Sequence, residues 1–318
     1  MLLNFALIFI GIALLVWSAD RFTDGASALA RNLGVSPLIV GLTIVAIGSS
    51  APEIFVSVTA ALNNTPGLAI GNAIGSNIAN IALVLGLTAL ITPLEVDSNV
   101  LRREFPVLFA VSFVVGVGMS DLYLNFIDGV ILISGMFVYL FWLIRLAMKP
   151  KHSPDPMIKE MLEELPDEMT NKQAIFWLVI GLIVLPNSSQ ILVSGAVGIA
   201  KQFGVSEFTI GLTIVALGTS LPELAASIAG VLKGEHELAI GNVIGSNIFN
   251  LLAVLGLAAL VQPSPINASV LYGDYLLMMF LTFVMFIMAY GFKGPGRISR
   301  LEGSVLTLVY IGFLAMQV

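Results

Sequence analysis

The sequence contains no cysteine, only two histidines and few charged residues, and each shortage argues against a class of protein. Without cysteine the chain has no disulfide, no thiol nucleophile and no thiolate metal ligand. His152 and His236 both fall in segments that we expect to be loops, which argues against a serine–histidine catalytic pair inside a membrane. Charged residues make up 11% of the 318 residues and hydrophobic residues make up 58%. This balance indicates a membrane protein and favours no class of enzyme.

Apolar stretches long enough to cross a bilayer, about 20 residues each, recur along most of the chain. The first, residues 2–17, has neither a basic leader nor a small-residue cleavage site, so we interpret it as a membrane helix and not as a signal peptide. The expected fold class is an all-α polytopic membrane protein with ten transmembrane helices. Their expected positions are 2–19, 37–62, 69–92, 105–120, 127–147, 174–194, 207–232, 239–262, 271–291 and 302–316.

The chain is internally duplicated. Residues 41–93 align without a gap on residues 211–263, with 30 identities in 53 positions. Each copy brings five predicted helices, and because five is odd the second half enters the membrane upside down. Such inverted repeats are typical of secondary transporters, whose substrate site lies near the middle of the membrane. We expect a first five-helix repeat at 1–147, a polar linker at 148–172 with a short helix near 157–165, and a second five-helix repeat at 173–318.

The basic residues predict the orientation. With ten spans, all but one of the 14 Lys and Arg residues fall on one side of the membrane, and the exception is Lys201. Lysine and arginine are enriched in cytoplasmic loops. We therefore expect both termini to be outside, that is periplasmic in a bacterium, and the 148–172 linker to be cytoplasmic.

Two glutamates lie at the predicted depth of the hydrocarbon. Glu53 stands in GLTIVAIGSSAPEIFVSVTAAL and Glu223 stands in GLTIVALGTSLPELAASIAGVL, and neither stretch contains another acidic residue. An ionisable group at this depth destabilises insertion by a few kcal/mol and therefore marks a functional site. Its recurrence in the same setting makes an accidental placement a poor explanation.

A proline precedes each glutamate. Pro52 and Pro222 have no N–H for the carbonyl four residues back, which belongs to Gly48 or Gly218. Freed backbone at membrane depth is tolerated where it is buried or lines a cavity, and its carbonyl oxygens can bind cations. The alternative is a proline kink without a ligand, but the adjoining carboxylates favour the functional interpretation.

Helical spacing collects oxygen atoms on the same faces as the glutamates. In the first copy, Ala46, Ser49, Ser50 and Glu53 stand at i, i+3, i+4 and i+7, and the next predicted helix places polar residues at i, i+4 and i+8. Two carboxylates among hydroxyls, amides and carbonyls suit calcium or sodium and do not suit zinc or copper. The candidate ligands are Glu53, Glu223, Ser49, Ser50, Thr219, Ser220, Ala46, Ala216, Ser76, Asn80, Ser246 and Asn250.

Helix–helix packing is the alternative role for the polar residues of the two GNxxGSNxxN segments. Their glycines form small-xxx-small patterns that let helices approach closely, with polar cross-links between them. We favour packing for Asn72, Asn77, Asn242 and Asn247, and ligation for Ser76, Asn80, Ser246 and Asn250.

These elements resemble the paired repeats of the cation/calcium antiporter superfamily, the sodium/calcium exchangers. The G-[ST]-S-x-P-E and G-N-x-x-G-S-N-x-x-N motifs occur twice, and the resemblance covers nearly the whole chain. The absence of a large central domain is similar to the bacterial branch and implies a bacterial inner membrane protein. The resemblance further implies alternating access, with the first and sixth helices acting as mobile gates.

The resemblance also assigns roles to residues. Glu53 and Glu223 match the central glutamates of the family, and Ala46 and Ala216 match positions that lend backbone carbonyls. Asn250 is a departure, since some members have an aspartate there, so this site has two carboxylates and not three. The hydroxyl and amide ligands match Ser49, Ser50, Thr219, Ser220, Ser76, Asn80, Ser246 and Asn250.

The resulting hypothesis is exchange of Ca²⁺ for Na⁺ across the membrane, and the alternative is Ca²⁺/H⁺ exchange, since two glutamates bind one Ca²⁺ or two protons. A channel is disfavoured because an inverted repeat inside one chain is suited to alternating access, and an aspartyl protease would need paired aspartates. We expect no cofactor, no nucleic acid and no obligate protein partner. The expected partners are Ca²⁺, Na⁺ or H⁺ as transported ions and the lipid bilayer.

Overall fold

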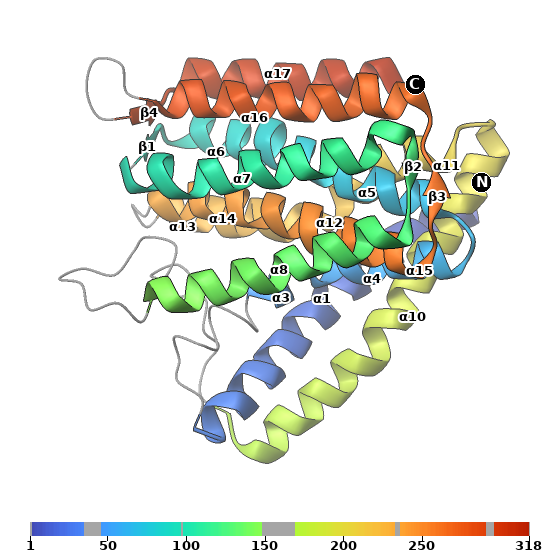
Figure 1. Ribbon diagram of the computed structural model, residues 1–318. Helices are drawn as coiled ribbons and strands as arrows, with labels where there is room; N and C mark the ends of the chain where they lie inside the picture. The colour runs from blue at the N-terminus through green and yellow to red at the C-terminus, as the bar shows by residue number, and fades with distance from the viewer. Residues whose placement is uncertain are drawn as a thin grey trace.

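The computed structural model describes residues 2–34, 46–96, 98–147, 169–232, 236–290 and 296–317. Its described part consists of two sets of membrane helices and two very short strand pairs (Figure 1). The expected short helix near 157–165 and most of the 148–172 linker lie outside the described residues.

Five helical segments make up the first half. The second is interrupted near its middle, and the third contains a π-helical turn that joins two α-helical parts. In order the segments are α1 (Leu2–Asn32), α3 (Ala46–Ser49) with α4 (Ala51–Leu62), α5 (Pro66–Ala79) with η2 (Asn80–Leu85) and α6 (Gly86–Ile91), α7 (Ser98–Gly118), and α8 (Phe126–Ala147).

The second half repeats this order, and three π-helical turns fall within its described residues. Its segments are α10 (Asn171–Phe203), then α11 (Glu207–Ile210), η4 (Gly211–Val215), α12 (Ala216–Thr219) and α13 (Leu221–Leu232), then α14 (His236–Phe249), η5 (Asn250–Val254) and α15 (Leu255–Val261), then η6 (Val270–Tyr275) with α16 (Leu276–Ala289), and α17 (Arg300–Gln317).

The offset of 170 residues found in the sequence holds for the helices. Adding it to Ala51–Leu62 gives the bounds of α13, and adding it to Pro66–Ile91 gives the bounds of α14 through α15. Two antiparallel strand pairs lie at opposite ends of the bundle (Figure 1): β1 (Leu94–Val96) pairs with β4 (Gly296–Ile298), and β2 (Tyr123–Leu124) pairs with β3 (Ser264–Pro265). Each pair joins the two halves, as an inverted repeat requires.

The first and sixth helices are longer than predicted. The sequence prediction ended the first at residue 19, but α1 continues to Asn32, and α10 spans Asn171–Phe203 where 174–194 was expected. At 1.5 Å per residue, α1 is about 46 Å long, well beyond the hydrocarbon thickness of about 30 Å. The prediction stopped at the first charges, Asp20 and Arg21, which lie on the helix and not in a loop.

The second segment of each half is broken where the prolines predict it. Residues 37–45 of the expected helix 37–62 lie outside the described residues, and the remainder divides at Ser50 into α3 and α4. Ser220 separates α12 from α13 in the same way, and both serines have similar non-helical backbone angles (φ −90°, ψ 9° and φ −85°, ψ 4°).

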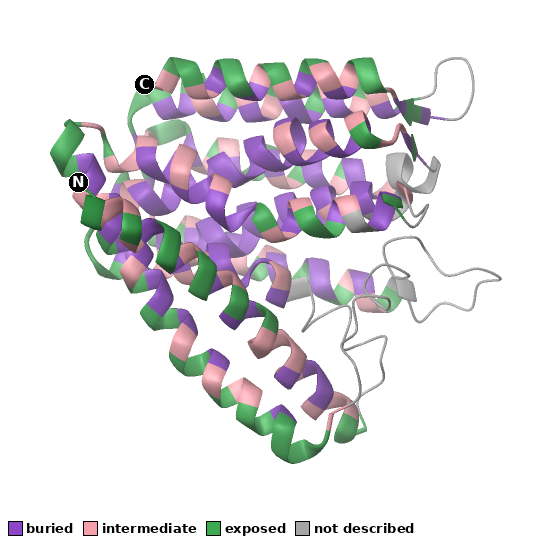
Figure 2. Cartoon of the chain, turned by 180° about the vertical axis from the view of Figure 1, so that it is seen from behind, coloured by how far each residue is buried: buried purple, intermediate pink, exposed green. Residues whose placement is uncertain are grey.

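Close helix packing holds the centre together. A Cβ atom at Gly71 would overlap the carbonyl of Phe208, and one at Gly75 would overlap the carbonyl of Leu212. Glycine at these two positions therefore lets α5 lie against α11 and η4, as the small-xxx-small pattern predicts. The two segments α5 to α6 and α14 to α15 form the most buried part of the molecule (Figure 2).

The outer helices present an apolar surface suited to lipid. Eight helices of the described chain are long and apolar enough to cross a membrane. Large apolar side chains such as Phe9, Phe137 and Phe280 are more than half exposed on them. Helices α1 and α10 pack against each other as a long antiparallel pair that runs obliquely to the remaining helices (Figure 1).

Candidate functional site

The two membrane glutamates begin the second parts of the broken helices. Glu53 lies in the first turn of α4 and Glu223 in the first turn of α13. Both are almost fully buried, with exposed fractions of 1% and 2%. Their carboxylates lie near enough to each other to interact electrostatically. A helix N-terminus stabilises a negative charge by its unpaired N–H groups, but two neighbouring buried charges still repel, so the arrangement favours a bound cation.

Most of the other candidate ligands are buried with the glutamates. Ser49 is half-buried, and Ala46 begins α3, although its side chain lies outside the described part. The buried candidates are Ser50, Ser76, Asn80, Ala216, Thr219, Ser220, Ser246 and Asn250.

Hydrogen bonds connect the two halves at this point. The Ser76 Oγ and Thr219 Oγ1 atoms are 3.4 Å apart, and Thr219 Oγ1 donates to Asn72 Oδ1 at 3.2 Å. Thr219 also lies close to the Glu53 carboxylate, which accepts no hydrogen bond of good geometry among the described residues. Residues from α4, α5 and α12 thus meet around one carboxylate, although 143 positions separate Ser76 from Thr219.

Several buried oxygen atoms of the site accept no hydrogen bond from the described residues. A buried polar atom without a partner is destabilising, so such atoms call for an explanation, and a bound ion is one. The described chain has no group of three or more His, Asp or Glu residues that could hold a metal by themselves. The unpaired atoms are both carboxylate oxygens of Glu53, the hydroxyls of Ser50 and Ser220, Asn80 Oδ1 and Asn250 Oδ1.

The asparagines for which the sequence predicts a packing role form hydrogen bonds between helices. Asn72 and Asn242 donate to the backbone carbonyls of Glu53 and Glu223, both at 3.3 Å. Asn77 donates to the Asn247 carbonyl at 3.3 Å. These amides cross-link helices, which is the packing role expected for them.

Asn80 does both. Its Nδ2 donates to Asn247 Oδ1 at 3.1 Å, while its own Oδ1 remains unpaired. The cross-link therefore fixes the amide so that its oxygen is left for another partner. Asn80 and Asn250 also begin the π-helical turns η2 and η5. Such turns are rare, occur mostly at functional sites and leave no periodic signal in the sequence.

The Ala216 carbonyl accepts a hydrogen bond from Ser220 N at 3.0 Å, and Thr219 Oγ1 lies 3.3 Å from it. The Thr219 hydroxyl has a single proton, which it gives either to this carbonyl or to Asn72 Oδ1. A carbonyl oxygen has two lone pairs, so cation binding by Ala216, which the family resemblance implies, is compatible with the bond from Ser220 N when the Thr219 proton goes to Asn72.

A polar cavity of about 360 Å³ reaches the site. It begins at α1 and ends at Ser49, Glu223 and Asn242, so it connects the buried carboxylate with the charged end of the first helix. Sequence reasoning missed the α1 residues because it assigned them to a loop. These residues are Asp20, Arg21, Thr23 and Asp24.

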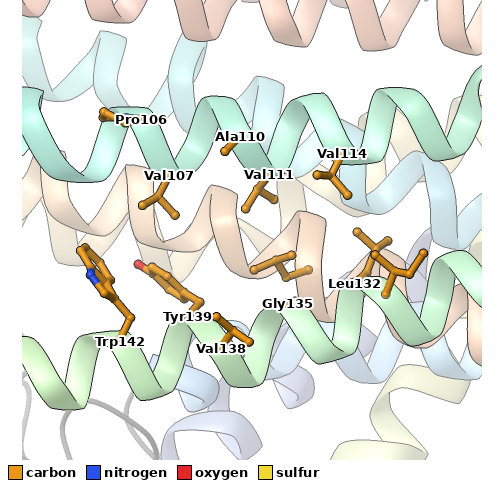
Figure 3. Close-up of a pocket in the computed structure, with 12 residues that line it drawn as sticks. Pro106, Val107, Ala110, Val111, Val114, Leu132, Gly135, Val138, Tyr139 and Trp142 are labelled. Atoms are coloured by element: carbon orange, nitrogen blue, oxygen red, sulfur yellow. The ribbon is translucent and has the colours of Figure 1, made fainter.

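A second cavity, between α7 and α8, has a different chemistry. It measures about 510 Å³ and its wall is apolar apart from the Tyr139 hydroxyl and the Trp142 N–H (Figure 3). It offers no set of oxygen ligands and therefore is no candidate for the cation site. Figure 3 shows side chains from both helices pointing into it, among them Val107, Val111 and Leu132.

Comparisons with known proteins agree along the whole chain. The sequence pattern of the sodium/calcium exchanger protein family matches residues 3–145 and 173–318. The putative antiporter CaxA of Alkalimonas amylolytica is 48% identical over 98% of both chains. The inner membrane protein YrbG of Escherichia coli strain K12 is 43% identical over 99% of this chain and 97% of YrbG. A structure of the sodium-calcium exchanger NCX_Mj, soaked with Na⁺ and Sr²⁺, is 32% identical with a TM-score of 0.65 over 99% of this chain and 98% of that one.

Proposed function

Because the chain belongs to the sodium/calcium exchanger protein family, whose members are transporters and not enzymes, we propose that it exchanges Ca²⁺ for Na⁺ by alternating access. The observation that carries the proposal is the pair of buried glutamates, Glu53 and Glu223, at the point where the inverted halves meet. Two carboxylates compensate the charge of one Ca²⁺, and the unpaired hydroxyl and amide oxygens supply neutral ligands of the kind that Ca²⁺ and Na⁺ accept.

The ligand set is also part of the proposal. Glu53 and Glu223 are its centre, and oxygens with no other partner are its best supported neutral members. Ser49 faces the polar cavity that reaches Glu223. The full set is Glu53, Glu223, Ser49, Ser50, Thr219, Ser220, Ala46, Ala216, Ser76, Asn80, Ser246 and Asn250.

We propose that α1 and α10 are the moving gates. The pair packs along its length through positions such as Gly11, which lies on Leu192, and Gly181, which lies on Phe22. A pair so joined can slide over the central helices as one unit. Pro186, inside α10, gives that helix a point at which it can bend.

The proposed location is a bacterial inner membrane, the location that YrbG carries in its name. Both chain ends lie on one side of the bundle, and the ends of α8 and α10 that flank the 148–172 linker lie on the other (Figure 1). The basic residues favour a periplasmic location for the chain ends and a cytoplasmic one for the linker. Reporter fusions at Val318 that were active only in the cytoplasm would contradict this orientation.

The deciding experiment is uptake of radioactive Ca²⁺ into proteoliposomes under an imposed gradient. Ca²⁺/Na⁺ exchange predicts uptake driven by an outward Na⁺ gradient at equal pH on both sides, with no uptake when choline replaces Na⁺. Uptake driven by a proton gradient alone would instead favour the Ca²⁺/H⁺ alternative. Uptake that needed no counter-cation at all would contradict both forms of antiport.

A further inference from the structure

The two repeats differ in how their broken helices are covered. Ala51 at the start of α4 is 3% exposed, while Leu221, at the repeat-related position of α13, is 43% exposed. Val56 is fully buried, and its counterpart Ala226 is exposed. Helix α10 packs along α4, whereas among the described residues neither α1 nor α10 packs extensively on α13, so the difference follows the position of the α1–α10 pair.

Helix α10 covers α4 tightly. The Thr59 Oγ1 and Ser189 Oγ atoms are 2.6 Å apart in a buried position, and Asn63 Nδ2 donates to Gln190 Oε1 at 2.9 Å. On the other side, the cavity of about 360 Å³ separates α1 from α13 and extends to Glu223. The site in this structure is therefore closed at the end of α4 and accessible along α1 from the side on which the 148–172 linker lies.

The cavity is lined by acidic residues of α1 that are neutral at the repeat-related positions of α10. At the offset of 170 residues, Asp20 corresponds to Gln190 and Asp24 corresponds to Ser194. The inverted repeat places these neutral counterparts towards the opposite side of the membrane. The acidic residues of α1 thus have no acidic counterpart on the described helix α10.

Arg21 compensates part of the negative charge of Asp20 and Asp24. Arg21 Nη1 lies 3.1 Å from Asp24 Oδ2, and the Arg21 guanidinium lies 5.2 Å from the centre of the Trp177 ring. Asp20 is exposed and has no hydrogen bond or ion pair with the described residues. Among the described residues that line the mouth of the cavity, Asp20, Arg21 and Asp24 carry two negative charges and one positive charge, and Glu223 lies at its inner end.

We propose that Asp20 is an access residue that draws Ca²⁺ and Na⁺ into this cavity and passes them to Glu223. The inference rests on the proposed function. A negatively charged cleft with walls of low dielectric constant raises the local concentration of cations and their rate of association, and this effect falls with ionic strength. Because α1 carries such charges and the repeat-related helix α10 does not, the exchanger should have a higher apparent affinity for cations on the linker side.

The test measures the apparent KM for Ca²⁺ separately on each face, in vesicles of uniform and opposite orientation. At low ionic strength, Asp20→Asn should raise KM on the linker side by about three- to tenfold, with KM on the other side and kcat unchanged. The matched control is Glu95→Gln, which removes an exposed carboxylate from β1 outside the cavity. The converse variant is Gln190→Glu, which should lower KM on the opposite face.

The outcomes separate the inference from the function on which it rests. Wild-type vesicles without Ca²⁺ flux would reject the proposed function. Normal wild-type flux combined with equal KM changes on both faces, or with an effect of Glu95→Gln as large as that of Asp20→Asn, would overturn the role of Asp20. A measurement without variants is also available, since KM of the wild-type protein should depend more steeply on salt on the linker side. Equal salt dependence on both faces would contradict the inference.

Discussion

Asn72 ties the helix that carries Glu53 to the neighbouring helix, because its Nδ2 donates to the backbone carbonyl of Glu53 at 3.3 Å and to Ser57 Oγ at 3.0 Å. Asn242 makes the same two bonds, to the Glu223 carbonyl at 3.3 Å and to Ser227 Oγ at 3.2 Å. Each glutamate is therefore held from behind, through its own backbone carbonyl, by an amide of the neighbouring helix. This shared anchor explains how both glutamates keep a fixed position after a break in the helix.

Removal of this anchor should destabilise the protein. Asn72→Ala leaves a buried carbonyl and a buried hydroxyl without their donor, which we expect to lower the free energy of unfolding by about 1–3 kcal/mol. The measurement is thermal unfolding in detergent, followed by size-exclusion chromatography. Asn187→Ala is the control, because Asn187 also donates to a backbone carbonyl, that of Ile183, but is exposed. Equal melting temperatures for both variants would contradict an anchoring role for Asn72.

Neutralising either glutamate should stop calcium transport. Glu53→Gln and Glu223→Gln keep the shape of the side chain but leave one Ca²⁺ only half compensated in a medium of low dielectric constant. We expect Ca²⁺ flux to fall to background while expression and melting temperature are maintained. Glu95→Gln, outside the site, should transport normally. Near-normal Ca²⁺ flux in either site variant would remove the basis of the proposed mechanism.

Gly71 and Gly75 of α5 should tolerate no side chain. Gly75→Ala places a methyl group against the backbone of Leu212, so α5 and η4 have to separate, and we expect a loss of about 1–3 kcal/mol in stability. Gly312→Ala, on α17, is the matched control because no atom lies within 4 Å of the added methyl group. Thermal unfolding of both variants tests this, and a Gly75→Ala protein as stable as the control would show that the close approach is dispensable.

Much of the fold follows from the sequence because its determinants are local. Apolar length predicts the spans, the duplication predicts the symmetry, and Pro52 and Pro222 predict the breaks. The length of α1 could not be predicted this way, because Asp20 and Arg21 resemble loop residues unless the helix is known to project beyond the hydrocarbon. The π-helical turns at Asn80 and Asn250 depend on tertiary packing and leave no periodic signal.

The candidate site is predictable in composition but not in arrangement. Sequence spacing places the serines and glutamates on shared helical faces, yet it does not reveal that Thr219 reaches Asn72 and Ser76 of the other half. These facts depend on how two helices from opposite halves meet, and no property of either segment alone determines that contact.

The prolines that break the helices should matter more for transport than for stability. Pro52→Ala and Pro222→Ala each restore an amide donor, so α3 can join α4, or α12 can join α13, as one continuous helix. Continuity at Ser50 or Ser220 would turn the following glutamate away from its partner. We expect at least a tenfold loss of Ca²⁺ flux, the order expected when a ligand is misplaced by about 1 Å. Wild-type flux in both variants, measured beside their melting temperatures, would show that the breaks are only structural.

Exchange with sodium should move net charge, and exchange with protons should not. Glu53 and Glu223, when ionised, carry two negative charges, and Asn80 and Asn250 add none. One Ca²⁺ or two protons therefore give a neutral centre that can change its access, while an empty centre keeps two charges buried and cannot return alone. The unpaired oxygens of Ser50, Ser220, Asn80 and Asn250 are neutral ligands that add no charge when Na⁺ binds. A third Na⁺ would make the returning centre positive by one charge.

The charge of the returning centre can be measured by clamping the membrane potential of proteoliposomes with K⁺ and valinomycin. A centre with one positive charge couples transport to the potential by about 2.3 kcal/mol per 100 mV, which changes the Ca²⁺ gradient at equilibrium by more than tenfold. Asn250→Asp supplies a matched test of the arithmetic, because it adds one negative charge to the site without changing the shape of the side chain. If the two glutamates are the only charged groups of the wild-type site, the Asn250→Asp variant should carry Ca²⁺ only together with an additional monovalent cation or proton. If sodium-driven Ca²⁺ flux did not change with the clamped membrane potential, only two Na⁺ ions would be exchanged for each Ca²⁺.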